Sequence, residues 1–391
     1  MPLSMRTLLS PLVIALTCGL GVGVARALPI VPTHDDEVIE RLPAINGSRG
    51  VERRLRQRLA QQPQDAQAAL ALAQRNLDRA HELGDPRFAG IAMAAIAGWP
   101  DAASMPDAVL LMRASLQQYL HEFDASAASL QQLLARPGAP RPQAWLMLAT
   151  VRRVQGRYAD ADRACAQVAA AGAALHARAC LAENAALRGD IDRARAEFGV
   201  LLAIAAGQPS ATRAWLTTSV AELEQRAGNA AGAEAAFRAA LALESDPYAT
   251  LAWADFLIEQ RRPAQALALL SGQPRSDAVL LRLAIAGTRA RTASAAADAA
   301  EMRERIALAN ERPDAQRVHG REQAMFALAV ERDAARALAL ARVNVERQRE
   351  PLDLLVLAQA ARASADAEAL REALALTARI GLHDRRIERL R

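Results

Sequence analysis

The residues that could carry out chemistry are few and widely separated along the chain. The six histidines are His34, His81, His121, His176, His319 and His383. They do not form the H-E-x-x-H spacing of a zinc protease, and no cysteine–histidine spacing of a structural zinc site is present. The G-x-S-x-G motif of a serine hydrolase and the Walker phosphate loop are also absent. We therefore expect no catalytic residues, no metal site and no cofactor.

The charge of the chain is nearly balanced for its length of 391 residues. All 48 basic residues are Arg, 43 residues are acidic, and the formal net charge is +5. So small an excess of positive charge is weak evidence for a nucleic-acid partner, and we expect none.

The composition predicts an all-α fold. About a quarter of the residues are Ala, the strongest helix former, and only 3% are aromatic. The β-branched and aromatic residues that strands favour are scarce. With 52% hydrophobic residues, the chain has enough apolar surface to fold rather than remain disordered.

The first 27 residues have the three parts of a secretory signal peptide. Arg6 supplies a positive start, an apolar run follows, and Ala25-Arg26-Ala27 matches the small-residue cleavage pattern. We expect cleavage after Ala27, and an uncleaved membrane anchor is the alternative. Residues 28–50 contain prolines, an acidic cluster and an Asn-Gly turn signal, which predict an extended linker.

One pattern of large and small residues recurs along the chain from about residue 51. Its best copy consists of Trp145, Leu148, Ala149, Gly156, Tyr158 and Ala161. Further copies surround Gly189, Gly228 and Arg261, each with Ala followed by Phe or Leu at matching offsets. The pattern predicts turns near residues 84, 121, 156, 189, 228, 261, 291, 332 and 364. A repeat of this length in a helical chain indicates a solenoid of helical hairpins.

This pattern resembles the motif of the tetratricopeptide-repeat (TPR) superfamily, and the chain is similar to exported bacterial TPR proteins. The resemblance covers nearly all of residues 51–391 and is clearest over residues 107–272, although Cys165 stands where a large apolar residue is usual. It implies an all-α, right-handed superhelical solenoid of about nine helical hairpins. A generic alanine-rich helical bundle is the alternative, but a bundle would not place small and large residues in phase at several positions.

Two cysteines follow the N-terminal segment, and the repeat frame places Cys165 and Cys180 on neighbouring helices. Both lie at nearly the same distance from the turn expected at Gly172. Since a helix rises about 1.5 Å per residue, two antiparallel helices bring both side chains to a similar height. We therefore expect a disulfide, which an exported protein can form in an oxidising compartment. Two buried thiols in small core positions are the alternative.

In TPR proteins the first helix of each hairpin lines a concave groove that holds a peptide or a partner helix. By this resemblance the groove residues are Gln143, Thr150, Arg153, His176, Glu183, Trp215, Glu222, Gln225, Tyr248 and Asp255. Trp215 and Tyr248 are of most interest, because large amphipathic side chains are frequent at binding hot spots. They either contact a partner or pack against a neighbouring helix.

The resemblance implies a non-catalytic scaffold that binds a protein or peptide, and the N-terminal signal implies that it does so in the bacterial periplasm. A second hypothesis is an envelope assembly factor whose basic ends contact anionic lipid or polymer. These ends are Arg49, Arg53, Arg54, Arg56 and Arg58, and Arg385, Arg386, Arg389 and Arg391. Polar capping of the terminal repeats is the simpler explanation of both clusters. An enzyme with a site in the groove is a third hypothesis, which no motif supports. The sequence predicts neither the identity of the partner nor the oligomeric state.

Overall fold

The computed structural model describes residue 34 and residues 48–311 and 319–391. The predicted signal peptide, residues 1–27, and nearly all of the predicted linker, residues 28–50, lie outside this part of the chain. Residues Gly50–Arg391 form one compact unit. The described residues contain no strand, which confirms the all-α prediction. Among these same residues, every helix is too short or too polar to span a bilayer.

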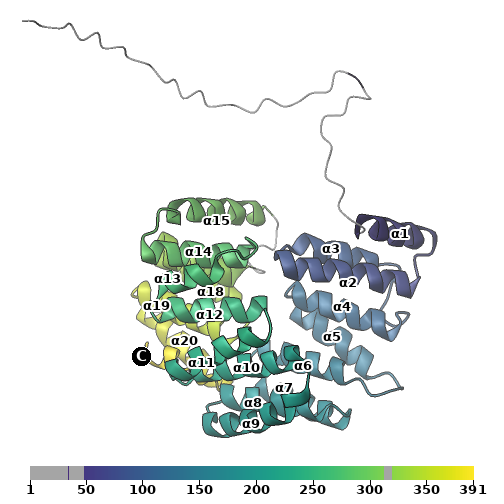
Figure 1. Ribbon diagram of the computed structural model, residues 1–391, viewed down its shortest axis with the longest axis horizontal. Helices are drawn as coiled ribbons and strands as arrows, with labels where there is room; N and C mark the ends of the chain where they lie inside the picture. Colours follow the sequence, from purple (N-terminus) through teal and green to yellow (C-terminus); the bar gives the residue numbers. More distant parts are fainter. Residues whose placement is uncertain (1–33, 35–47, 312–318) are drawn as a thin grey trace, which may run out of the picture. The chain divides into compact units, whose positions relative to one another are not determined.

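The compact unit is a series of antiparallel helical hairpins (Figure 1). After α1 (Ser48–Gln61), the first five hairpins are α2 (Ala66–Leu83) with α3 (Pro86–Ala95), α4 (Asp107–Tyr119) with α5 (Phe123–Leu134), α6 (Pro142–Val154) with α7 (Tyr158–Ala170), α8 (Ala174–Leu187) with α9 (Ile191–Ile204), and α10 (Ser210–Arg226) with α11 (Ala230–Leu243). The later ones are α12 (Pro247–Glu259) with α13 (Pro263–Leu270), α14 (Asp277–Ala290) with α15 (Ala295–Asn310), α17 (Gly320–Phe326) with α18 (Ala334–Val345), and α19 (Pro351–Ala363) with α20 (Ala367–Ile380), followed by α21 (Arg385–Glu388).

Each hairpin turns at one residue in the left-handed backbone region. These residues are Gly84, His121, Gly156, Gly189, Gly228, Arg261, Arg291, Arg332 and Ala365, with φ between 56° and 88°. The predicted turn positions therefore match the nine hairpins of the described chain, and only the last turn differs, by one residue. The prediction of an all-α array of nine helical hairpins is confirmed for the described residues.

Local sequence signals determine where many of the helices begin. The side chains of Asp65, Asp246 and Asp366 each accept a hydrogen bond from a backbone N–H in the first turn of the helix that follows. This bond satisfies a donor that the helix itself cannot pair. Proline opens α6, α12 and α19, where its missing N–H costs nothing.

The first helices of successive hairpins form a continuous inner layer. From α2 onward, α4, α6, α8, α10, α12, α14, α17 and α19 each contact the first helix of the preceding hairpin. Small side chains permit this close approach, since Ala149, Ala182 and Ala221 are buried. Large residues fill the space between hairpins, and Phe198 and Phe237 are fully buried. Because the array is curved, the side on which neighbouring helices touch is its inner side.

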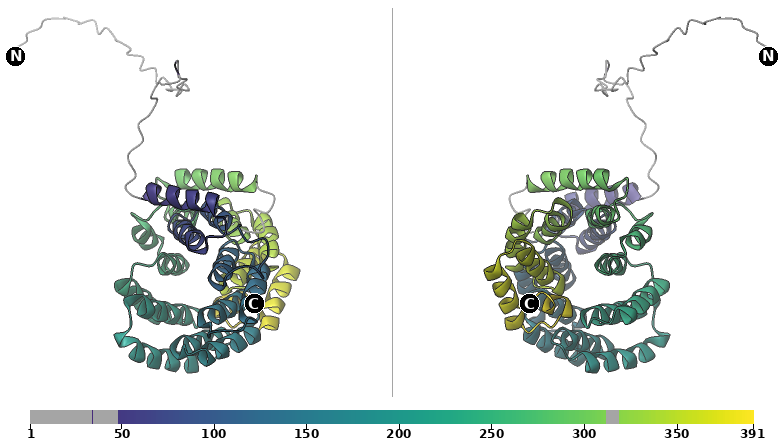
Figure 2. Two further views of the ribbon diagram at one scale, coloured as in Figure 1. Left: turned by 90° about the vertical axis from the view of Figure 1, so that its right-hand side faces the viewer. Right: turned by 90° about the vertical axis from the view of Figure 1, so that its left-hand side faces the viewer.

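The array curves back until its C-terminal hairpins contact the turns of its early hairpins (Figure 2). The backbone N–H of Arg349 donates to the carbonyl oxygen of Val154 at 2.7 Å, and that of His383 donates to Leu187 at 2.8 Å. Val154 and Leu187 end α6 and α8, where carbonyl groups have no partner within the helix. The side chains of Gln348 and His121 are also hydrogen-bonded, at 2.7 Å.

Glycine at the turns makes room for this contact. A Cβ atom added to Gly189 would lie 2.8 Å from Cγ of His383, and one added to Gly156 would lie 3.2 Å from Cβ of Arg349. These glycines therefore serve both the left-handed turn and the close approach of a segment that lies far along the chain.

Cys165 on α7 and Cys180 on α8 form the predicted disulfide, with their Cα atoms 5.8 Å apart. Both residues are buried in the core between these helices. The bond joins neighbouring hairpins and closes a short segment of 15 residues in sequence separation.

Substitution of Gly189 by Ala tests the contact across the superhelix. Gly172→Ala is the matched control, because Gly172 also has a positive φ but no neighbouring atom lies within 4 Å of an added Cβ. We expect the control to lose about 1–2 kcal/mol of unfolding free energy from backbone strain. Gly189→Ala should lose a further 1–3 kcal/mol, roughly, from overpacking against His383. Urea denaturation of both variants measures the difference, and equal losses would contradict the contact.

Removal of the disulfide should destabilise the chain without unfolding it. The loop-entropy relation gives about 3 kcal/mol for a loop of this length. We expect the Cys165→Ala, Cys180→Ala double variant to show this loss in urea denaturation under oxidising conditions. A reducing agent should lower the stability of the wild type to a similar extent and leave the variant unchanged. An effect of the reducing agent on the variant would show that the loss has another source.

Candidate functional site

Five polar residues on successive first helices form a row along the inner face, here called the polar row. It consists of Arg153 on α6, Glu183 on α8, Ser219 and Glu222 on α10, and Tyr248 on α12. Arg153 forms an ion pair with Glu183, whose other carboxylate oxygen accepts a hydrogen bond of 2.6 Å from Ser219. The Tyr248 hydroxyl donates to Glu222. These bonds link Arg153, Glu183 and Ser219 across three successive hairpins. A separate bond links Tyr248 with Glu222 on the preceding hairpin.

Tyr248 is the exposed member of the polar row. Its residue surface is 62% exposed, more than that of any other large hydrophobic or aromatic residue noted in the described chain. The negative charge of Glu222, together with partial removal from bulk water, holds the pKa of Tyr248 well above its ordinary value. Burial raises the pKa of Glu222. Tyr248 therefore presents an aromatic ring to solvent with its hydroxyl held in place as a protonated donor.

Trp215 occupies a different environment from Tyr248. It is partly buried against the core cluster around Phe198 and Leu216, and its ring stacks on His176 with the ring centroids 5.7 Å apart. Of the two readings that the sequence leaves open, packing against a neighbouring helix describes Trp215 and exposure describes Tyr248.

The remaining predicted groove residues lie at the margins of this row. Asp255 on α12 pairs with Arg282 on α14 at 2.6 Å. Gln225 donates to Glu259 at 2.8 Å. Gln143 is exposed at the start of α6. The structure thus brings Arg153, Glu183, Glu222 and Tyr248 together and leaves Gln143 apart; that these residues bind a partner stays a prediction.

Sequence reasoning missed residues from distant parts of the chain. Glu350, which precedes α19, contributes to the raised pKa of both Tyr248 and Glu222. No local signal marks it, because about a hundred residues separate it from the polar row. Ser219 was also missed, since a serine within a helix has no pattern that distinguishes it from a solvated one.

A partly buried ionic cluster lies at the start of α17 and α19. Arg321 contacts Glu322 at 3.1 Å, Glu350 at 2.8 Å and Asp353 at 3.5 Å. Burial opposes ionisation of Glu322, but the charge of Arg321 outweighs it and holds the pKa of Glu322 at about 2. Burial raises the pKa of Asp353 to about 6. One arginine thus contacts three carboxylates. Ionisation of Glu322 stabilises the fold, whereas ionisation of Asp353 destabilises it, because folding shifts their pKa values in opposite directions.

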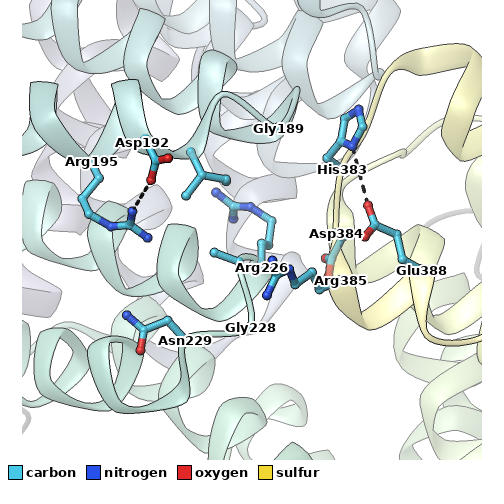
Figure 3. Close-up of a pocket in the computed structure, with 12 residues that line it drawn as sticks. Gly189, Asp192, Arg195, Arg226, Gly228, Asn229, His383, Asp384, Arg385 and Glu388 are labelled. Atoms are coloured by element: carbon cyan, nitrogen blue, oxygen red, sulfur yellow. Dashed lines mark hydrogen bonds and ion pairs between the residues drawn. The ribbon is translucent and has the colours of Figure 1, made fainter.

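A cavity of about 510 Å³ lies between the turns of two middle hairpins and the C-terminal segment (Figure 3). Gly189, Ile191, Asp192 and Arg195 line it from α8 and α9. Arg226, Ala227, Gly228 and Asn229 line it from the next hairpin, and His383, Asp384, Arg385 and Glu388 line it from the C-terminal segment. No local sequence pattern predicts this cavity. Its walls come from segments that are far apart in the sequence and meet only where the C-terminal segment contacts the turns at Gly189 and Gly228.

Some arginines of the two basic clusters, at the start and the end of the helical array, form ion pairs with acidic residues of the fold. Arg386 is held by Asp384 at 2.6 Å and by Glu259 at 3.3 Å. At the other end, Arg56 pairs with Glu52 and Arg58 with Asp65. Arg386, Arg56 and Arg58 therefore form ion pairs within the fold, and neither capping nor contact with an anionic surface is tested by these pairs. Across residues 48–311 and 319–391, no group of three or more His, Cys, Asp or Glu side chains is arranged to hold a metal ion.

No protein-family model matches the chain, and no curated protein sequence is similar to it. Among solved structures, the Cut9–Hcn1 hetero-tetramer of the APC/C matches with a TM-score of 0.44 and 14% identity, over 83% of this chain. The match spans 59% of the length of that protein chain. A Rap protein complexed with competence and sporulation factor matches with a TM-score of 0.44 and 10% identity, over 88% of this chain and 93% of the other.

Both solved structures share 14% identity or less with the chain. The fold of the chain therefore stands on its own geometry, which is that of the helical-hairpin array expected from its sequence. Its nine hairpins, its inner layer of first helices and its recurrent small residues define this geometry.

Replacement of Glu322 by Gln should change how stability depends on pH. Folding lowers the pKa of Glu322 from its ordinary value of 4.5 to about 2. An acid of this kind stabilises the folded state fully when the pH is above its unfolded pKa, and this stabilisation is lost as the pH falls toward the folded pKa. We expect Glu322→Gln to be less stable than the wild type by about 3 kcal/mol at pH 7, and this difference to fall to about half at pH 3.

Urea denaturation at intervals between pH 7 and pH 3 measures this difference. Glu388→Gln, at an exposed position, is the control and should parallel the wild type. A gap between Glu322→Gln and the wild type that stays constant over this range would contradict the assignment.

Proposed function

We propose that this chain is a non-catalytic scaffold that binds a partner protein or peptide on the inner face of its solenoid. The observation that carries the proposal is the exposure of Tyr248 within the polar row. With 62% of its residue surface exposed, Tyr248 contributes little to the packing of its own helix. Tyrosine is enriched at binding hot spots because it offers a large apolar area and a hydrogen-bonding hydroxyl at small entropic cost.

The bonds within the polar row support binding rather than catalysis. Arg153 and Glu183 neutralise each other, and the Tyr248 hydroxyl donates a hydrogen bond to Glu222. A catalytic site would need a nucleophile within reach of a base and a group that stabilises charge in the transition state. Here each polar group instead holds its neighbour in place, which lowers the entropy that binding would otherwise cost.

The proposed location is the periplasm. The N-terminal run that ends at Ala27 matches a signal peptide. The disulfide between Cys165 and Cys180 supports an oxidising compartment. The partner would then be another exported protein.

A crosslinking capture from the native envelope tests the proposal. We expect Tyr248→Ala to retain its helical content and to lose the captured partner, with affinity reduced at least about tenfold. Val200→Ala is the matched control, since Val200 is also exposed but lies on α9, a second helix. It should capture the partner as the wild type does. Trp215 is left unchanged, because its packing would confuse a loss of binding with a loss of structure.

Two results would contradict the proposal. Capture that Tyr248→Ala does not weaken would move the binding surface away from the polar row. Capture that Val200→Ala and Tyr248→Ala weaken equally would point to a general loss of stability. The purified partner and its affinity, measured by titration calorimetry against each variant, separate these cases.

A further inference from the structure

The cavity beside the C-terminal segment has an unusual balance of paired and unpaired charges. Three carboxylates and three guanidinium groups line it. Asp384 is held by Arg386 at 2.6 Å and also caps α21. Asp192 pairs with Arg195 at 2.7 Å, and Glu388 is exposed beside His383. The acidic residues therefore already have partners or solvent.

Arg226 is the exception among the lining residues. Only 9% of its surface is exposed, and its Nε atom has no hydrogen-bond partner. No other described residue gives its guanidinium group a hydrogen bond or an ion pair. Glu222, one turn earlier on α10, and Tyr158 on α7 interact with it electrostatically, but neither forms a hydrogen bond or an ion pair with it. Arg385, across the cavity, likewise has no ion pair in the described chain (Figure 3).

A guanidinium that is nine-tenths buried and forms no hydrogen bond is costly, because its N–H donors have lost most of their water and the attraction of Glu222 offsets only part of that loss. Arginine keeps its charge at any ordinary pH, so it cannot relieve this cost by losing a proton. An anion in the cavity would relieve it. The helices α9 and α11 begin at the cavity wall, with Ile191 and Asn229 among the lining residues, and their positive ends favour an anion as well.

We propose that this cavity binds a small organic acid whose carboxylate is held by Arg226. The planar guanidinium offers two parallel N–H donors, which match the two oxygens of a carboxylate. A volume of about 510 Å³ lies in the range of sites for small molecules. The three carboxylates of the lining disfavour a doubly charged phosphate more than a singly charged carboxylate.

The ligand would contact both sides of the closed superhelix. Arg226 belongs to the fifth hairpin and Arg385 to the C-terminal segment. An anion between them would hold this segment against the turns at Gly189 and Gly228. Binding would therefore raise the melting temperature of the whole chain, since a ligand that binds only the folded state stabilises it.

Titration calorimetry of the full chain with defined probes tests this inference. Acetate, succinate, glutamate and citrate are the carboxylic acids, succinamide is the neutral control, and inorganic phosphate is the competing anion. We expect at least one acid to bind with millimolar affinity or better and to raise the melting temperature, and succinamide not to bind. Arg226→Met should weaken that binding about tenfold or more. Arg238→Met, at an exposed arginine outside the cavity, is the matched control and should bind as the wild type does.

The stability of the variants separates a ligand site from a structural role. If Arg226 serves a ligand, Arg226→Met without ligand should be about as stable as the wild type, because it loses no hydrogen bond or ion pair, and the cost of burying the guanidinium offsets the lost attraction to Glu222. Arg226→Lys keeps the charge and loses the two-pronged geometry, and it should fold and bind the acid more weakly. A destabilised Arg226→Met together with unchanged binding by Arg226→Lys would overturn the inference.

Other outcomes also overturn it. Binding of phosphate without any of the acids would refute the carboxylate assignment. Tighter binding of N-acetyl-glutamate amide than of the free acids would assign the site to an acidic side chain of a protein partner. Absence of binding by every acid at millimolar concentration would refute the carboxylate site and show that only water contacts the Arg226 guanidinium in the cavity. These tests need no partner protein, so they stand apart from the test at Tyr248.

Discussion

The contact between the C-terminal hairpins and the turns of the early hairpins is the interaction on which the rest of this structure depends. In an open solenoid each hairpin contacts only its neighbours, so stability accumulates along the chain. Here the backbone of Arg349 and that of His383 donate to carbonyl groups at the ends of α6 and α8. These bonds join residues that are about two hundred positions apart, and they convert a one-dimensional array into a closed unit.

Closure also determines the environment of the inner face. It brings Glu350 close enough to raise the pKa of Tyr248 and Glu222, although the three residues lie on different hairpins. It also forms the cavity in which Arg226 is buried without a partner. The polar row is therefore enclosed by protein and still open to solvent at Tyr248. Such a surface can hold a partner with little rearrangement, because its side chains are already fixed by one another.

The features that the sequence predicts are those with a local physical cause. Glycine, which a left-handed turn favours, stands at four of the nine turns of the described chain. The recurrence of small and large residues predicted the others, among them His121 and Arg261. The pairing of Cys165 with Cys180 follows from the same frame. The second role of Gly189, the burial of Arg226 and the position of Glu350 could not be predicted. Each depends on a contact between distant hairpins, and such contacts leave no periodic trace.

The two aromatic residues, Trp215 and Tyr248, also show which features depend on tertiary contacts and could not be predicted from the sequence. The repeat frame places both Trp215 and Tyr248 on first helices, and it assigns neither to a packing position. Which of them is exposed depends on the neighbours that the fold supplies. His176 and the core around Phe198 cover Trp215, whereas Tyr248 is 62% exposed and its hydroxyl donates to the Glu222 carboxylate.

Hydrogen exchange at the backbone amides of Arg349 and His383 tests the closure most directly. Both residues lie outside helices, so in an open solenoid their amides would exchange rapidly with solvent. The closed superhelix predicts protection comparable to that of amides within α6 and α8, because opening either bond requires the C-terminal hairpins to leave the turns. Rapid exchange at both amides, with the helices themselves protected, would contradict closure and with it the enclosed inner face.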